Sequence, residues 1–146
     1  MATDIALPFL GGCACGAVRY ECTARPLRMV NCHCRDCQVA SGSAYTATII
    51  MDANAVHVTE GAPKRYSRTA ESGNVAHRDF CENCGTPLFA ASSAGPQVLG
   101  VKAACLDDPS WFQPSADVWV GSAQPWDCMV PEMPKFPKNR PRDSNA

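Results

Sequence analysis

Seven of the ten cysteines lie in three short clusters, which carry the clearest chemistry in the sequence. The clusters are Cys13-Ala-Cys15, Cys32-His-Cys34-Arg-Asp-Cys37 and Cys81-Glu-Asn-Cys84. Cysteine thiolates two or three positions apart can chelate one zinc ion at about 2.3 Å. A glycine follows the first and third clusters, where it relieves the chelating turn. These seven cysteines are therefore predicted to be metal ligands.

The seven divide into a group of four and a group of three. A structural zinc ion takes four tetrahedral ligands, and two clusters far apart in the chain supply them. We call this set the four-cysteine cluster: Cys13, Cys15, Cys81 and Cys84. The remaining set is the three-cysteine cluster: Cys32, Cys34 and Cys37. Three protein ligands with an open position are typical of catalytic zinc, so we expect one structural and one catalytic ion.

Two other interpretations fit the same cysteines. Cys81 and Cys84 could be a redox dithiol, although no βαβ pattern surrounds them. The three-cysteine cluster could also be a closed structural site, with a fourth ligand from His33, His57, His77, Cys22, Cys105 or Cys128. We expect the ring of His33 to point away from an ion held by its neighbours, and His57 to be solvated. The isolated cysteines are expected to be small buried hydrophobes.

Composition favours one domain in a reducing compartment. A chain of 146 residues can bury a modest core without several disulfides, and its net charge of -1 favours neither a nucleic-acid nor a membrane partner. Residues 1–10 carry no basic region of a secretory signal, and no apolar run approaches the ~20 residues of a membrane span. We therefore expect a cytoplasmic protein with reduced thiols.

Short β-like segments must position these cysteines. Helical periodicity is almost absent, so we expect an all-β chain of antiparallel sheets with a short helical turn at 35–40. The strands are predicted at 17–22, 44–51, 55–59, 64–68, 75–80, 88–91, 97–103 and 116–120. Turns are predicted at Gly11-Gly12, Ser41-Gly42, 61–63, 72–74 and 94–96.

The C-terminal residues differ from the rest in composition. Residues 131–146 are rich in proline and basic residues and have no periodic apolar face. We expect a single zinc-binding domain over 1–130 and an extended tail over 131–146. Its basic residues are expected to be solvated, with an acidic partner as the alternative: Lys135, Lys138, Arg140 and Arg142.

Three segments in fixed order carry a family resemblance: GGCACGAVRYEC (11–22), NCHCRDCQVASG (31–42) and RDFCENCGTPLF (78–89). Together they resemble the glutathione-dependent formaldehyde-activating enzyme family, which includes centromere protein V. Its signature reads GGCxCGxVRYE, CHCxxCQxxSG and FCxxCGTxLF, and the similarity extends to Pro125-Trp126. The resemblance implies a β-tent fold of coiled antiparallel sheets. It also implies a structural zinc on the four-cysteine cluster and a catalytic zinc on the three-cysteine cluster.

The resemblance implies an activity as well. The family reaction adds glutathione to formaldehyde to give S-hydroxymethylglutathione, formally a carbon-sulfur lyase in reverse, with glutathione as cosubstrate. Glutathione is anionic, so Arg35 and Arg78 are candidates to bind its carboxylates, and ordinary surface or salt-bridged roles are the alternative. Asp36 is the carboxylate nearest to the cysteines in sequence, and no general base stands out.

One departure concerns the substrate. The family often has a histidine in a P-x-x-H-I segment, where this chain has Asp117. If that histidine shapes the pocket, we expect an electrophile other than formaldehyde. Two further hypotheses are a glutathione carrier without catalysis and a zinc-stapled interaction module. The sequence predicts nothing about the oligomeric state.

Overall fold

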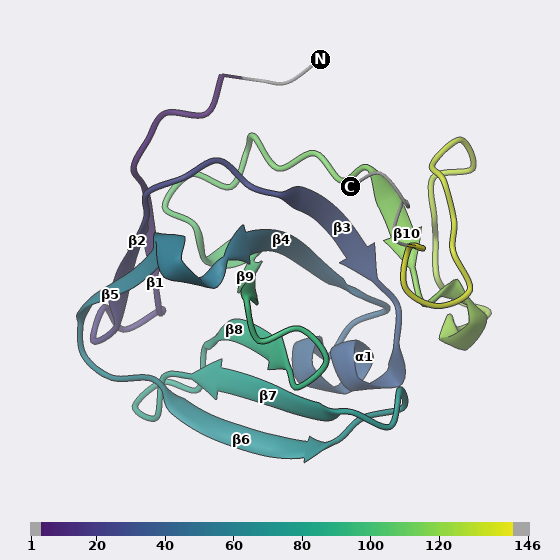
Figure 1. The fold of residues 1–146 in the computed structure, drawn as a ribbon, viewed down its shortest axis with the longest axis horizontal. Helices are drawn as coiled ribbons and strands as arrows, with labels where there is room; N and C mark the ends of the chain where they lie inside the picture. The colour runs from purple at the N-terminus through teal and green to yellow at the C-terminus, as the bar shows by residue number, and fades with distance from the viewer. Residues whose placement is uncertain (1–3, 142–146) are drawn as a thin grey trace.

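The computed structural model describes residues 4–141. Within that range, ten strands, one α-helix and three single-turn 3-10 helices form (Figure 1). The strands are β1 (Phe9–Gly12), β2 (Arg19–Cys22), β3 (Arg28–Cys32), β4 (Thr46–Asp52), β5 (Val56–Glu60), β6 (Lys64–Thr69), β7 (Val75–Phe80), β8 (Pro87–Ser92), β9 (Val98–Lys102) and β10 (Ala116–Val118). The helix is α1 (Arg35–Ser41), and the 3-10 turns are η1 (Ala53–Ala55), η2 (Ala103–Cys105) and η3 (Val120–Ser122). The expected mainly β class is confirmed.

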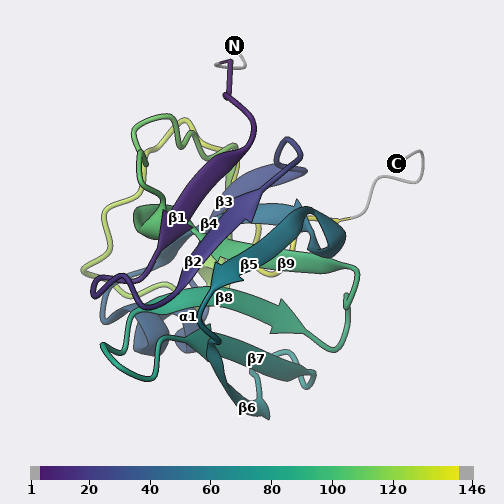
Figure 2. The same ribbon diagram turned by 90° about the vertical axis from the view of Figure 1, so that its left-hand side faces the viewer.

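The strands form two sheets. One has the order β1-β2-β5, and the other has the order β10-β3-β4-β9-β8-β7-β6. All neighbours are antiparallel except β10 and β3, which run parallel. Figure 2 shows β1, β2 and β5 crossing in front of the larger sheet. The described residues contain no helix that is long and apolar enough to cross a membrane.

The main core lies between the two sheets. Tyr20 of the smaller sheet is 1% exposed, and its ring meets Phe89 of the larger sheet edge-on at 5.0 Å between centroids. Ile49, Met51 and Val101 complete this layer with no exposed surface. Alternating apolar positions on β4 and β9 face this layer, because successive side chains of a strand point to opposite faces.

Two strands lie where the sequence analysis placed none, β1 and β3. We expected a turn at Gly11-Gly12, but both glycines pair in β1. A Cβ atom at Gly11 would lie 2.3 Å from the Tyr20 hydroxyl, so this glycine serves close packing and not a turn. β3 lacks a regular alternation of buried residues, which explains why its pattern was missed. β7 forms with the predicted bounds, the other predicted strands form with shifted ends, and α1 forms as the expected helical turn.

The C-terminal residues pack against the body of the protein. The backbone of Lys135 forms an isolated parallel β-bridge with that of Asp117, and the backbone amide of Phe136 donates to the Asp117 carbonyl at 2.9 Å. The Phe136 ring packs against Val30, Ala116 and Val118. Lys135, Lys138 and Arg140 are exposed, as expected for solvated basic residues, whereas Phe136 is half-buried. The boundary at residue 131 stays a prediction, and Arg142 lies outside the described residues.

Candidate metal centre and pocket

The four sulfur atoms of the four-cysteine cluster come together from two loops distant in sequence. All four lie within 4.8 Å of one another. The Sγ of Cys15 lies 3.6 Å from that of Cys13 and 3.8 Å from that of Cys81. A tetrahedron with zinc–sulfur bonds of about 2.3 Å has edges of about 3.8 Å. The arrangement therefore fits one tetrahedral zinc ion.

Hydrogen-bond donors surround these sulfur atoms. The backbone amide of Val18 donates to the Cys13 Sγ at 3.2 Å and lowers the pKa of that thiol. The side chain of Asn83 donates to the Cys15 Sγ, also at 3.2 Å. Hydrogen bonds with Thr86 lower the pKa of Cys84 to about 5. Such donors favour thiolates, the form that binds metal.

The three-cysteine cluster is built by the end of β3 and the start of α1. Cys32 is the last residue of β3, and Cys34 is the N-cap of α1, where its Sγ accepts from the backbone amide of Cys37 at 3.3 Å. The three sulfur atoms lie within 4.8 Å of one another. Among residues 4–141, no further histidine, cysteine or carboxylate joins this group.

The candidates for a fourth ligand lie elsewhere. His33 is fully buried with both ring nitrogens bonded to carboxylates, which agrees with the expectation that it points away from an ion. His57 is exposed as expected, and His77 is bonded to Ser67 at 2.7 Å. Cys22 is buried as expected, Cys105 is half-buried, and Cys128 is exposed, contrary to expectation. The geometry does not favour a closed structural site.

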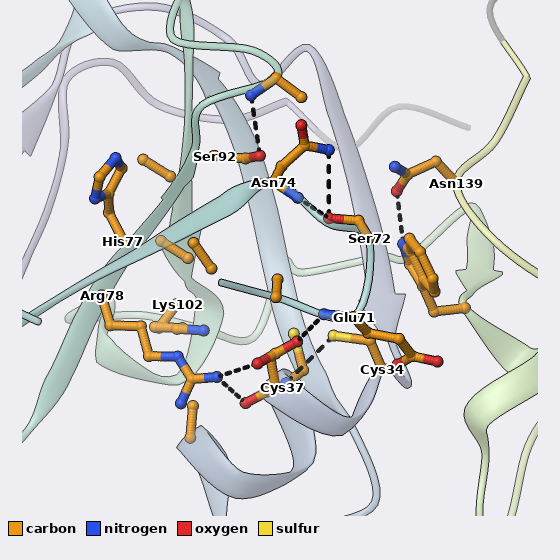
Figure 3. A pocket seen from close by; sticks show the side chains of 18 residues that line it. Cys34, Cys37, Glu71, Ser72, Asn74, His77, Arg78, Ser92, Lys102 and Asn139 are labelled. Carbon is orange, nitrogen blue, oxygen red and sulfur yellow. Dashed lines mark hydrogen bonds and ion pairs between the residues drawn. The ribbon is translucent and has the colours of Figure 1, made fainter. Parts of the chain in front are cut away.

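A pocket of about 190 Å³ opens over the three-cysteine cluster. Cys34 and Cys37 lie in its wall, together with Arg78 from β7 and Lys102 from β9 (Figure 3). The pocket is also lined by Glu71, Ser72 and Asn74 from the β6–β7 loop, and by Trp119 and Asn139 from the C-terminal part of the chain. The indole Nε1 of Trp119 donates to Asn139 Oδ1 at 2.8 Å.

The three thiols have unequal proton affinities. The neighbouring thiols of Cys32 and Cys34 lower the pKa of Cys37 well below its usual value, and the Lys102 ammonium acts in the same direction. Cys34 and Cys37 in turn raise the pKa of Cys32. Burial lowers the pKa of Lys102, and the nearby cysteines oppose that shift.

Asp36 holds two arginines beside the pocket. Its carboxylate lies 3.4 Å from Arg68 Nε and 3.6 Å from Arg78 Nη2, and Arg78 also donates to the Asp36 backbone carbonyl. Arg35 is exposed, donates to Gln38 Oε1 at 2.7 Å and does not line the pocket. Of the two arginines predicted to bind substrate, only Arg78 reaches the pocket.

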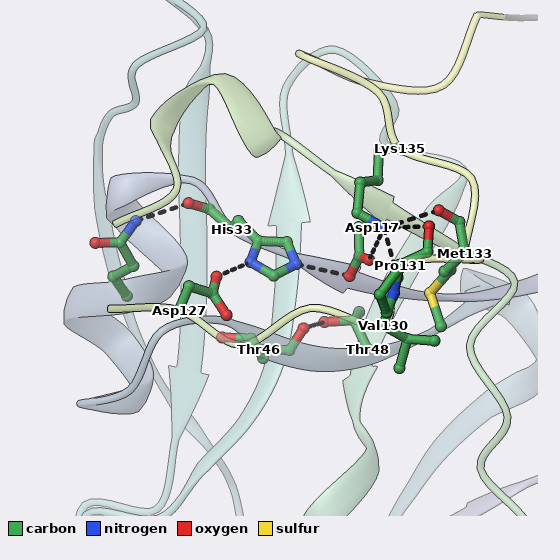
Figure 4. A network of polar contacts seen from close by, with 10 residues as sticks. His33, Thr46, Thr48, Asp117, Asp127, Val130, Pro131, Met133 and Lys135 are labelled. Carbon is green, nitrogen blue, oxygen red and sulfur yellow. Dashed lines mark hydrogen bonds and ion pairs between the residues drawn. The ribbon is translucent and has the colours of Figure 1, made fainter. Parts of the chain in front are cut away.

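His33 joins the three-cysteine cluster to the C-terminal part of the chain. Its Nε2 lies 2.7 Å from Asp117 Oδ1, and its Nδ1 lies 2.5 Å from Asp127 Oδ2 (Figure 4). Both ring nitrogens thus lie within hydrogen-bond distance of a buried carboxylate oxygen. Lys135 lies 3.7 Å from the other Asp117 oxygen. The His33 ring therefore connects the loop of Cys32 and Cys34 to Asp117 and Asp127.

Asp117 belongs to this buried network and does not line the pocket. It is 1% exposed, lies in β10 and is not among the residues that line the pocket. The departure from the family pattern at this position therefore alters the support of the three-cysteine cluster and leaves the pocket wall unchanged.

Several pocket residues escaped the sequence analysis. Lys102 had one available signal, since it is a lone lysine in the otherwise apolar and small-residue run 98–105. Glu71 and Asn139 had none, because their approach to the cysteines depends on how the strands and the C-terminal part pack.

Comparisons with known proteins agree with this architecture. Residues 8–122 match the family model described as glutathione-dependent formaldehyde-activating enzyme. An uncharacterized lyase of Schizosaccharomyces pombe is 31% identical over 85 residues, which cover 58% of this chain and 58% of that protein. The match thus spans less than two thirds of the length of that relative.

A solved structure is similar in fold. The crystal structure of a Rhodobacter sphaeroides protein superposes with a TM-score of 0.56 and 21% sequence identity. The alignment covers 86% of this chain and 98% of that one. The likeness concerns the arrangement of the strands, and at this identity it carries no conclusion about chemistry.

Proposed function

Because the chain belongs to the glutathione-dependent formaldehyde-activating enzyme family, we propose that it is a zinc-dependent carbon-sulfur lyase acting on glutathione adducts. Formation of S-hydroxymethylglutathione from glutathione and formaldehyde is the reference reaction. The relative that is named a lyase supports this class. One observation carries the proposal: three cysteine sulfur atoms meet at a pocket, and no fourth ligand joins them among the described residues.

The two cysteine clusters have different tasks in this proposal. The four-cysteine cluster holds a structural zinc that joins the N-terminal loop to the loop after β7. The three-cysteine cluster holds a second zinc, which supplies an open coordination position where a thiol is bound as thiolate at neutral pH. The substrate sulfur is the proposed occupant of that position.

Charged groups of the pocket suit glutathione, which carries two carboxylates and one ammonium group. Arg78 is the proposed carboxylate partner, because its guanidinium has further N–H donors besides those used on Asp36. Glu71 lines the pocket beside Asp36 and is the proposed partner for the ammonium group, which would share its carboxylate with the Ser122 hydroxyl and the Arg35 amide. All ten cysteines are free thiols, which supports work in a reducing compartment, and we propose the cytoplasm.

The test is the rate of adduct formation with the zinc-loaded protein. Glutathione and formaldehyde also combine without a catalyst, so the exchange rate must be compared with a protein-free control, for example by NMR exchange spectroscopy. We expect acceleration by the wild type and by Cys128→Ser, whose thiol is exposed and outside both clusters. We expect none by Cys34→Ser.

Other outcomes identify the alternatives. Calorimetric binding of glutathione without any acceleration would contradict catalysis and favour a carrier. Absence of both binding and acceleration would leave the interaction module. Loss of zinc without loss of rate would remove the metal from the mechanism.

A further inference from the structure

Lys102 is a buried lysine that is aimed into the pocket. It ends β9 and is 7% exposed, although lysine is among the residues least often found buried. Within residues 4–141, its ammonium group makes neither a hydrogen bond nor an ion pair with a carboxylate. The thiols of Cys32, Cys34 and Cys37 favour its charged form. Because no carboxylate or hydrogen-bond acceptor of the described residues engages the ammonium group, its N–H donors are available to a ligand in the pocket.

The surroundings of Lys102 identify where that partner lies. Lys102 lines the pocket with Cys34 and Cys37, and Figure 3 shows its side chain extending toward the cysteines. The nearest other cation of the wall, Arg78, is already engaged by Asp36 at 3.6 Å. Lys102 is therefore the uncommitted cation beside the sulfur atoms.

The covalent structure of the adduct then decides which atom Lys102 meets. The carboxylate carbons of glutathione are separated from its sulfur by at least six bonds. An oxygen on the carbon attached to the sulfur is separated by two bonds. A cation beside the three-cysteine cluster is thus placed for this oxygen, and the other cation of the wall, Arg78, is held by Asp36.

We propose that Lys102 is a catalytic residue that binds the oxygen on the carbon attached to the substrate sulfur. This inference rests on the proposed function and deepens it. It implies that the protein selects thiol adducts that carry an oxygen on that carbon, and that it discriminates against plain thioethers of the same size.

Formation of the adduct makes one sulfur–carbon bond and breaks one carbon–oxygen π bond. A lone pair of the glutathione thiolate forms the sulfur–carbon bond, and the π pair of the carbonyl moves to its oxygen. The Lys102 ammonium donates a hydrogen bond to this oxygen as the negative charge develops. The proton that the thiol released is taken up by the oxygen through solvent, and the reverse sequence cleaves the adduct. No oxidant or reductant takes part.

Binding of two stable glutathione conjugates tests the inference without turnover. S-acetylglutathione has an oxygen on the carbon next to sulfur, and S-ethylglutathione has the same heavy-atom skeleton without it. By calorimetry on the zinc-loaded protein, we expect the wild type to prefer the acetyl conjugate about tenfold, as for a hydrogen bond to a charged donor. Lys102→Met should reduce the preference to about twofold or less, and Lys102→Arg should keep part of it.

Controls separate the possible failures. Lys64→Met, an exposed lysine on β6, should behave as the wild type. Zinc content and thermal unfolding of each variant show whether Lys102 only neutralises the metal centre. Zinc loss from Lys102→Met with an unchanged preference after reloading would overturn the inference.

The wild type alone also gives a decisive result, even if Lys102→Met fails to fold. Equal affinity for the two conjugates, in a protein that accelerates adduct formation, would overturn the role of Lys102 and leave the proposed function standing. A wild type that neither binds the conjugates nor accelerates the reaction would overturn both.

Discussion

Cys34 and Cys84 have the same side chain but hold different parts of the molecule. Cys84 belongs to the four-cysteine cluster, which joins two distant loops, whereas Cys34 caps α1 at the pocket. Each serine variant should lose about one zinc ion per chain by elemental analysis. Cys84→Ser should lower the melting temperature by about 10 °C or more, because structural zinc contributes to folding, and Cys34→Ser should lower it less. An equal fall in melting temperature for the two variants would contradict the division of tasks between the clusters.

His33 is the residue on which the rear of the three-cysteine cluster depends. His33→Gln would leave the buried carboxylates of Asp117 and Asp127 without the imidazole ring that both contact. We expect the free energy of unfolding, measured in urea, to fall by about 3 kcal/mol. The control His57→Gln changes an exposed ring and should shift it by less than about 0.5 kcal/mol. A similar effect of both variants would show that the buried ion pairs contribute nothing.

The side chains at and around the two cysteine clusters were predictable to different degrees. The seven cysteines could be found from type and spacing, because chelation is local in sequence. His33 was expected to point away from the ion, but its partner Asp127 lies 94 positions away and leaves no local pattern. Lys102 reaches the cysteines through the pairing of β9 with β4, which no short motif records.

Strand β1 depends on the absence of a side chain at Gly11. Gly11→Ala would place a Cβ atom 2.3 Å from the Tyr20 hydroxyl and 2.6 Å from the Cys105 carbonyl. Backbone must move to relieve the second contact, so we expect about 2 kcal/mol of destabilisation in urea unfolding.

The matched control is Gly95→Ala in the β8–β9 turn. A Cβ atom there would meet Val98 at 3.6 Å, an ordinary contact. Its effect should stay within about 0.5 kcal/mol. If Gly11→Ala is equally well tolerated, the two sheets are less tightly packed than described.

At the level of elements, alternation and turn residues were sufficient for eight of the strands and for α1. β2 starts two residues later than predicted, because Val18 turns its amide toward the Cys13 sulfur. β1 was missed because its glycines have the same composition as a turn, and only the facing Tyr20 explains them.

The C-terminal part of the chain is a structural component of the whole molecule. Removing residues 131–146 would delete the Lys135 contact with Asp117 and expose Val30 and Val118, which Phe136 covers. We expect a loss of about 3 kcal/mol in urea unfolding. An unchanged stability after this deletion would show that the contacts of Lys135 and Phe136 contribute nothing.

The arrangement of the whole molecule was predicted in class but not in detail. Zinc-stapled antiparallel sheets were expected, and two sheets with one parallel pair formed. The parallel pairing of β10 with β3 joins segments that are far apart in sequence, since His33 and Asp117 are separated by 84 positions. This pairing brings the C-terminal part of the chain beside the pocket. Composition alone describes that part as proline-rich and basic, and it carries no information on the surface that it covers.

The central claim is that the three-cysteine cluster keeps one coordination position for a substrate sulfur. X-ray absorption at the zinc edge of the zinc-loaded protein tests it most directly. Without glutathione, one zinc with four sulfur ligands and one with three give an average of about 3.5 sulfur ligands per zinc. Saturating glutathione should raise this average to about 4. An average of 4 before glutathione is added, or one that glutathione leaves at 3.5, would contradict the claim.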